Sequence, residues 1–483
     1  MNNKSLNSMI RTRPAKSKMS NFTRQARAFT VLGLVLAATS TAKGIENKSF
    51  LQKTPDQDEL LMVVEVSRHG AREPSKILNF TADPNQNFNG TGNIMPLGKK
   101  QHFDLGQHMR QRYINDLKFL SANYTDNEVY VQTTYKQRTY LSSLYQLMGL
   151  YPDNQPPLSD YINYDIGRED YLSPIQKSGS IKPKVTTFNV VQIDAQADLL
   201  LHVDKDNCPR YAMTAQMTAQ SDEYAKVQKY FIDNFLDEFE RATNTSLSFK
   251  QMVEVCGYMQ WAELANLTLN FTPTASIDQY CLAMGDTKLY SVSYGLDELW
   301  KLGAFEFLNK LNYISNALKD GVQLKIKGRL PKLIHYAAHA ETLAAFFDGL
   351  GIHRVKRSFP GSALFFEIYK NSQDTIYVKL NYFHGDNRTL DVVKFPNQQE
   401  DTLSLSDFMN NLQKRLSQTN FTDVKNQCQN TNINTHPSDF YSGDKVLQEL
   451  EEAYQTQKMI QSETINIPDD ISTQPQKLFL KEE

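Results

Sequence analysis

The sequence contains no apolar run that would cross a bilayer comfortably, and it has no excess of basic residues. The first candidate, Ala28–Ala38, is shorter than the roughly 20 apolar residues of a transmembrane helix, and no later stretch qualifies. The chain has 52 basic and 54 acidic residues, a net charge of −2. Proteins without basic clusters are poor candidates for binding nucleic acid or anionic lipid. We therefore expect no nucleic-acid partner and no stable membrane anchor.

Cysteine is scarce as well. The chain has four cysteines, Cys208, Cys256, Cys281 and Cys428. They lack the Cys-x-x-Cys spacing that is typical of many zinc and redox sites. Four cysteines permit three disulfide pairings, and in an exported chain disulfides are commoner than a metal site. We expect neither a metal nor another cofactor.

The N-terminal segment is typical of a secretory signal peptide. Residues 1–42 carry seven Lys or Arg and no acid, and the run Ala28–Ala38 is followed by the small residues Ser40 and Ala42. We expect cleavage after about Ala42, which leaves 45 basic and 54 acidic residues, a net charge near −9. Export also fits the frequent glycosylation sequons, at Asn79, Asn89, Asn123, Asn244, Asn266, Asn270, Asn387 and Asn420.

The length of the mature chain predicts two lobes. About 440 residues exceed what one hydrophobic core usually holds. The pattern is predominantly helical from about Cys208 to Leu318 and mixed on either side. We therefore expect a discontinuous α/β domain at 43–205 and 320–430, an inserted helical cap domain at 206–319, and a polar C-terminal tail at 431–483.

One stretch concentrates charge at the end of a strand. Leu60–Val66 is a nearly unbroken apolar run, typical of a strand buried on both faces of a parallel sheet. It is followed by Arg68, His69, Gly70 and Arg72. Ligands of open α/β sheets bind at the carboxyl ends of strands. The stretch therefore predicts an anion site with an imidazole between two guanidinium groups.

At these residues the sequence resembles the histidine acid phosphatases, branch 2 of the histidine phosphatase superfamily, whose signature is Arg-His-Gly-x-Arg-x-Pro. The resemblance implies an α/β fold with a mainly parallel sheet flanked by helices, like that of phosphoglycerate mutase, and an inserted helical cap. It also favours the disulfides Cys208–Cys428 and Cys256–Cys281. Such a protein would be secreted or lysosomal.

Two further junctions complete the resemblance. Glu128 to Thr134 alternates as a strand, and Arg138 follows it where the family has an arginine that reaches the phosphate. Residues 332–338 form another predicted strand, followed by His339, Ala340 and Glu341. Most relatives have His-Asp here, with the Asp as proton donor. The His-Ala-Glu order resembles that of the multiple inositol polyphosphate phosphatases, in which the Glu takes that role.

These residues together predict phosphate-ester hydrolysis. Arg68, Arg72 and Arg138 would bind the non-bridging oxygens, because guanidinium groups pair bidentately with phosphate. His339 would add a donor, and neutral His69 would attack phosphorus to form a phosphohistidine that water hydrolyses. Glu341 would protonate the leaving group. Nearby cations lower the pKa of His69, so we expect activity in mildly acid solution.

The sequence leaves other functions open. An inositol polyphosphate phosphatase or phytase would have a wide pocket with several extra Lys or Arg from the cap. A secreted phosphate-ligand-binding protein would bind product without forming phosphohistidine. A transferase like phosphoglycerate mutase fits an exported chain less well, and a homodimer is possible. His102, His108 and His335 lie within predicted helices or strands, so we expect structural roles for them.

Overall fold

The computed structural model describes residues 58–78, 81–82, 88–152, 188–265 and 267–452. The expected signal segment, the sequons at Asn79 and Asn266, and residues 453–483 of the expected tail lie outside these ranges. Within the described part, residues 443–452 form a helix that buries Val446 and Leu450.

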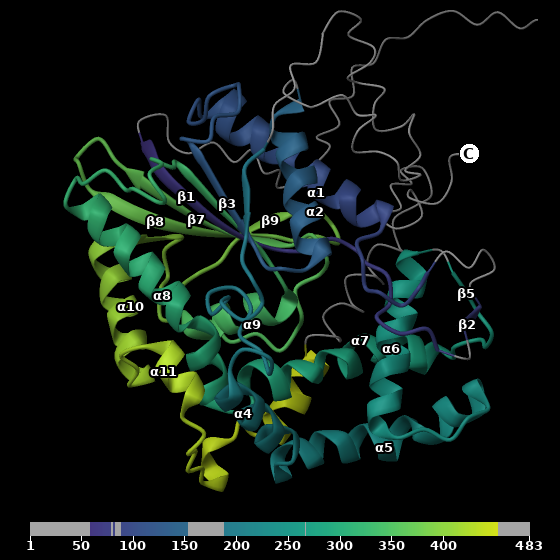
Figure 1. The fold of residues 1–483 in the computed structure, drawn as a ribbon. Coiled ribbons are helices and arrows are strands. Elements are labelled where there is room, and N and C mark those ends of the chain that lie inside the picture. The colour runs from purple at the N-terminus through teal and green to yellow at the C-terminus, as the bar shows by residue number, and fades with distance from the viewer. Residues whose placement is uncertain (1–57, 79–80, 83–87, 153–187, 266, 453–483) are drawn as a thin grey trace, which may run out of the picture. The chain divides into compact units, whose positions relative to one another are not determined.

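The centre of the fold is a mixed sheet whose first half is parallel. The order on this side is β1, β6, β3 and β4, all parallel to their neighbours. Their bounds are β1 Glu59–Arg68, β6 Leu333–Ala338, β3 Val129–Thr133 and β4 Val190–Gln192. This half matches the mainly parallel arrangement that the sequence predicts, and it brings the carboxyl ends of β1, β3 and β6 to one edge (Figure 1).

The other half of the sheet is antiparallel. Beyond β1 come β7 and β8, with β9 and β10 both paired to β8. The bounds are β7 Ala363–Lys370, β8 Ile376–Phe383, β9 Leu390–Val392 and β10 Thr402–Ser404. A separate two-stranded sheet joins β2 (Thr81–Ala82) to β5 (Thr268–Leu269).

Helices cover both faces of the large sheet because its strands are apolar on both sides. Val63 of β1 packs with helices α1 and α2, whereas Val64 and Val66 pack with α8, α9 and α10 (Figure 1). The bounds are α1 Pro96–Met109, continued by the π-helix η1 Arg110–Asp116, α2 Gln137–Leu150, α8 Asp297–Lys319, α9 Ala340–Gly349 and α10 Leu405–Thr419.

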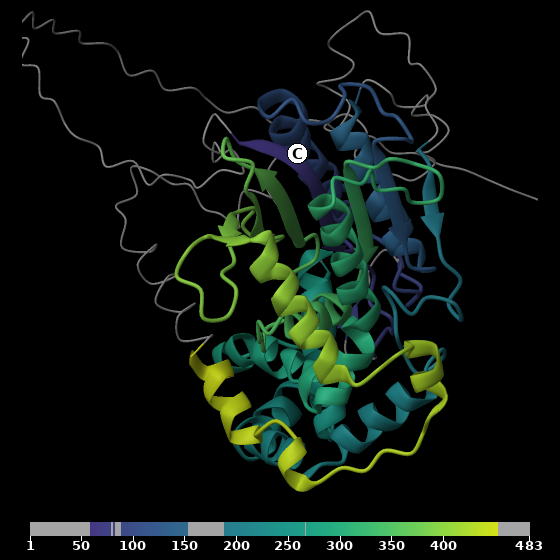
Figure 2. The ribbon, with the colours of Figure 1, turned by 90° about the vertical axis from the view of Figure 1, so that its left-hand side faces the viewer.

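A group of helices gathers beyond one end of the sheet in both views (Figures 1 and 2). One apolar cluster joins α5, α6, α7 and η4, and another joins α11 and the start of α4 to α8. The bounds in this part of the chain are α4 Pro209–Ala219, α5 Asp222–Thr243, α6 Phe249–Leu264, α7 Ala275–Asp286, η4 Tyr290–Tyr294, α11 Val424–Gln429 and η5 Pro437–Asp439. A helical lobe is therefore present. Its exact domain boundaries stay a prediction, since α8, inside the expected cap, packs on the sheet.

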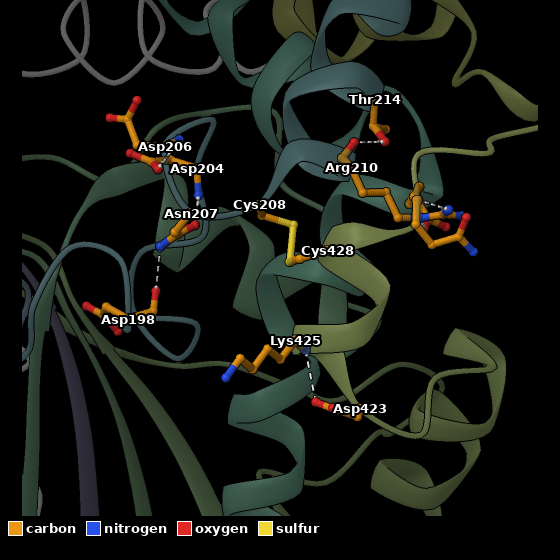
Figure 3. Close-up of a disulfide and its surroundings, with 12 residues drawn as sticks. Asp198, Asp204, Asp206, Asn207, Cys208, Arg210, Thr214, Asp423, Lys425 and Cys428 are labelled. Atoms are coloured by element: carbon orange, nitrogen blue, oxygen red, sulfur yellow. Dashed lines mark hydrogen bonds and ion pairs between the residues drawn. A yellow bond between two sulfur atoms is a disulfide. The ribbon is translucent and has the colours of Figure 1, made fainter.

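Both disulfides that the resemblance favours are present. Cys208–Cys428 joins the start of α4 to α11 across 220 residues, and Cys256–Cys281 joins α6 to α7. Next to the first, the side chain of Asn207 donates to the backbone carbonyl of Asp198 (Figure 3). It also donates to the backbone carbonyls of Ala195 and His202. Asn207 therefore fixes the loop that carries His202 toward the carboxyl ends of the strands.

Candidate active site

The loop that carries the Arg-His-Gly-x-Arg-x-Pro signature, Arg68–Pro74, is called the motif loop, and it begins where β1 ends. The amide of His69 donates to the carbonyl of Ala338, the last residue of β6, over 3.0 Å, and the amide of Arg68 donates to Ser362. A Cβ on Gly70 would lie 2.2 Å from the carbonyl oxygen of Gly98 at the start of α1. Only glycine therefore lets the motif loop and α1 approach so closely.

His69 is held as the tautomer that a nucleophile needs. Its Nδ1 lies 2.8 Å from the carbonyl oxygen of Gly70. A carbonyl only accepts hydrogen bonds, so Nδ1 carries the proton and Nε2 keeps its lone pair. The side chain is buried, and burial, followed by the charges of Arg138 and Arg68, holds the pKa of His69 well below its usual value. The imidazole is therefore neutral in mildly acid solution.

The three predicted arginines converge beside His69. Arg72 donates from Nη1 to the carbonyl of Glu73 over 2.6 Å and to Oγ of Ser75 over 2.9 Å. A Cβ on Gly92 would lie 3.5 Å from Nη1 of Arg72 and 3.8 Å from Nη1 of Arg138, so both guanidinium groups flank one point. Arg68 donates to the carbonyl of Ser358.

Two of these arginines keep buried donors without a partner. Within the described part of the chain, Nε of Arg68 and Nε of Arg138 make no hydrogen bond. Burial, and next the charge of Arg357, lowers the pKa of Arg68 to about 9. Crowded, desolvated cations with free donors form a site that an anion would stabilise.

His339 stands opposite His69 at the end of β6. Their ring centroids are 5.4 Å apart, and Nε2 of His339 lies 3.0 Å from Oγ1 of Thr134, just after β3. The hydroxyl of Thr139 donates to backbone carbonyls and so accepts from Thr134. Thr134 must then accept from His339, which places the proton on Nε2 and leaves Nδ1 to be protonated before it can bind an anion.

Glu341 lies in the first turn of α9, near these cations. Its carboxylate is 3.4 Å from Nζ of Lys288, and its side chain is 40% exposed. Burial alone would raise the pKa of Glu341, but Lys288 above all, followed by His339, holds it below the usual range. The carboxylate is therefore ionised while the site is empty of substrate.

All six predicted site residues thus lie together, although they come from three separate parts of the chain.

Comparison with known families gives an independent assignment, because the sequence profile described as "Histidine phosphatase superfamily (branch 2)" matches residues 59–382. The chain belongs to this superfamily. The match covers more than half of the chain and includes the motif loop, Arg138 and His339.

The chain is also similar to named acid phosphatases, and its fold is similar to that of a solved phytase. The chain is 26% identical over 386 residues to a lysosomal acid phosphatase of Xenopus laevis, covering 78% of this chain and 80% of that protein. It is 28% identical to the Rattus norvegicus enzyme of that name, covering 68% and 71%. Its fold is similar to that of a Hafnia alvei phytase in complex with tartrate, with a TM-score of 0.53, 16% identity, and coverage of 76% and 99%.

Sequence reasoning missed several residues of this histidine phosphatase site. Trp261 of α6 lies under two motif arginines, with its ring centroid 5.6 Å from Cζ of Arg68 and 4.7 Å from Cζ of Arg72. The ring of His202 is 4.7 Å from that of His339. Arg357 is paired with Asp286 over 2.6 Å and adds positive charge near Arg68. The only sequence signal was the rarity of tryptophan, of which the chain has two.

The remaining predicted histidines lie behind or beside the superfamily motif. His102 donates from Nε2 to the carbonyl of Arg68 and contacts Gln146 through Nδ1. His335 of β6 contacts Oγ of Ser67, and the ring of His108 packs near Phe383. Burial lowers the pKa of His102 to about 4 and that of His335 to about 3. Structural roles for these residues stay a prediction.

A cavity of about 890 Å³ opens beside Arg72. It is lined by Arg72, Trp261, Lys288 and Arg357 at the site and by α5 and α6 farther away. Among the described residues, no group of three or more His, Cys, Asp or Glu side chains could hold a metal ion. None of the described helices combines the length and apolar character that membrane crossing requires.

Proposed function

We propose that this protein is an acid phosphatase that hydrolyses phosphate monoesters through a covalent phosphohistidine on His69. The observation that carries the proposal is the convergence of neutral His69 with three arginines, two of which keep buried donors unpaired. The chain's membership of the superfamily and the acid phosphatase names of its relatives also support the proposal. Two disulfides and the lysosomal names of those relatives support a lysosomal or secreted location.

In the first step, the ester's phosphoryl group binds to Arg68, Arg72 and Arg138. Their planar guanidinium groups neutralise the non-bridging oxygens and orient phosphorus toward Nε2 of His69. Nε2 forms the new bond to phosphorus as the bond to the alcohol oxygen breaks. The bound anion also favours protonation of Nδ1 on His339, which then donates to the phosphoryl group while Nε2 stays on Thr134.

The departing alcohol oxygen needs a proton, and we assign its delivery to Glu341. The pKa of this carboxyl is low in the free site because of Lys288. A bound phosphate dianion reverses the local field and raises that pKa, so the donor role belongs to the substrate complex. Glu341 then accepts a proton from the water that attacks the phosphohistidine, which releases inorganic phosphate and regenerates His69.

The direct test is release of phosphate from p-nitrophenyl phosphate at pH 5, with acid-quench trapping of the labelled intermediate. We expect acid-labile phosphate on the wild-type protein and at least about a 10³-fold loss of turnover in His69→Ala. The control is His436→Ala, because His436 is exposed near η5 and outside the site. Tight phosphate binding without turnover or trapped phosphate would instead indicate a binding protein.

An inositol polyphosphate phosphatase is the second candidate, because the helical lobe contributes Lys250 and Lys288 to the cavity. Lys288 is already close to Glu341, and most of the cavity wall beyond the site is apolar. A substrate with many phosphates would leave that wall unused. We therefore favour a substrate with a single phosphate, and a kcat/KM for inositol hexakisphosphate above that for every monoester would reverse the choice.

A further inference from the structure

The cavity beside the active site has two walls with the same periodicity. Residues at every fourth position of α5 line one wall, and residues at every fourth position of α6 line the other. They are Tyr224, Gln228, Ile232 and Leu236 on α5, and Phe249, Val253, Gly257 and Trp261 on α6. Lys250, Glu254 and Tyr258 form a second, more polar row on α6, in which Glu254 pairs with Lys76 over 3.2 Å. Residues four apart share a helix face, so the cavity is a groove between two helix faces.

The groove is continuous with the phosphate site. Trp261 lies at its inner end, in contact with Arg68 and Arg72, and Phe249 lies twelve residues earlier on the same helix. At 1.5 Å per residue the α6 wall extends about 18 Å from the arginines. Val253 and Leu236 are only partly buried, and Ile232 is 36% exposed, so apolar surface faces the groove without being covered by the described residues.

Gly257 is the gap in the α6 wall. A Cβ placed on this residue would meet nothing within 4 Å, whereas in the middle of a helix glycine is less favourable than alanine. Close packing therefore does not explain this glycine. Its effect is to leave room in the groove between Val253 and Trp261. The neighbouring Cys256 is bonded to Cys281 of α7, which anchors the wall.

We propose that this groove binds an unbranched apolar chain on the alcohol part of the substrate, so that the enzyme prefers amphipathic phosphate monoesters. The proposal rests on the phosphatase function proposed above and specifies its substrate class. The phosphate would bind to the arginines, and the chain would follow α6 past Gly257. Apolar burial of this kind strengthens binding by up to about fourfold for each methylene removed from water.

The test is a series of n-alkyl phosphates from ethyl to octyl, assayed at pH 5 below their critical micelle concentrations. We expect kcat/KM to rise at least tenfold from ethyl to octyl phosphate in the wild-type protein. In Gly257→Leu, whose side chain fills the gap, the octyl-to-ethyl ratio should fall at least tenfold. The matched control Gly257→Ala adds only a methyl group to open space and should keep most of the ratio.

The outcomes separate this inference from the proposed function. A flat series with measurable ethyl phosphate turnover would overturn the chain site and leave the phosphatase intact, as would a Gly257→Leu variant that slows both esters equally. If no ester is hydrolysed, the phosphatase fails, and calorimetry still tests the groove. Octyl phosphate should then bind to His69→Ala at least tenfold more tightly than ethyl phosphate, and equal affinities would overturn the inference. Thermal melting checks that each variant is folded.

Discussion

The rings of His69 and His339 meet edge to face with their centroids 5.4 Å apart, at the ends of the adjacent parallel strands β1 and β6. Both rings are buried, and both lie near the positive charge of Arg138. Burial and this charge lower the pKa of each histidine. The pair is therefore uncharged in the free site, and charge enters with the substrate.

The first prediction concerns the protonation of His69. Because its pKa is lowered, the proton binds only at a pH well below 6.5, and the lone pair on Nε2 stays available at pH 5. In ¹⁵N spectra of the free protein, the His69 signals should not titrate between pH 7 and pH 5, and their absence in His69→Gln assigns them. A midpoint near 6.5 would contradict the lowered pKa of His69. A pH–rate profile that peaks above pH 8 would contradict the expected activity in mildly acid solution.

The second prediction concerns the hydroxyl chain from His339 to Thr134 and Thr139. Thr134→Val keeps the shape of the side chain but removes the acceptor for Nε2 of His339. We expect about a tenfold lower kcat, with a change in the acid limb of the pH–rate profile, since the tautomer of His339 is no longer fixed. Thr134→Ser should restore both. Equal losses in the Val and Ser variants would show that Thr134 matters only for packing.

The third prediction concerns Arg138, which has a buried Nε without a partner among the described residues. Arg138→Gln should lower kcat/KM for p-nitrophenyl phosphate by about 100-fold and weaken inhibition by inorganic phosphate, because one anion-binding donor group is lost. Arg241→Gln, at an exposed arginine near the end of α5, is the matched control. Unchanged phosphate inhibition in Arg138→Gln would place the anion elsewhere.

The fourth prediction separates Glu341 as a proton donor from Glu341 as a helix-terminus charge. Glu341→Gln should slow ethyl phosphate, whose leaving group is strongly basic, by about 100-fold or more, and p-nitrophenyl phosphate by much less. Phosphohistidine should still form from the aryl ester. Lys288→Met removes the nearest cation and should move the alkaline limb for ethyl phosphate to higher pH. Equal rates on both esters would remove Glu341 from the mechanism.

The sequence predicted the parts of the site that are local in the chain. The strand before Arg68, the strand before His339 and the helix after Arg138 each follow from an apolar pattern that ends in charged residues. Trp261, His202 and Arg357 reach the site from distant loops and helices, and no local pattern marks them. Their roles depend on how the helical lobe packs against the strand ends. Burial of both faces of β1 implies a buried Glu65, as observed, but no local pattern marks its partner Gln146, which comes from α2.

Glu65 yields the last prediction, which concerns stability. Burial, only partly offset by the hydrogen bonds from Gln146, raises the pKa of Glu65 to about 8. Nε2 of His335 lies 3.9 Å from the Glu65 carboxyl group, and His102 contacts Gln146. The lowered pKa values of both histidines keep them neutral above pH 5 in the folded protein. The folded protein thus keeps a proton on Glu65 that the unfolded chain releases above pH 4.5. Its stability should therefore fall as the pH rises toward 8, by about 1.4 kcal/mol per pH unit from this group.

Glu65→Gln replaces the neutral acid with a neutral amide of the same shape and should remove this dependence. Urea unfolding of both proteins at pH 5 and pH 7.5 measures the difference, in which the contributions of His335 and His102 cancel. Between these two pH values, the wild-type protein should lose about 3 kcal/mol of unfolding free energy relative to the variant. Parallel changes in both proteins would mean that Glu65 is ionised in the folded state throughout. A protein whose interior acid favours pH 5 over pH 7.5 in this way is suited to the acid conditions in which we propose that neutral His69 reacts.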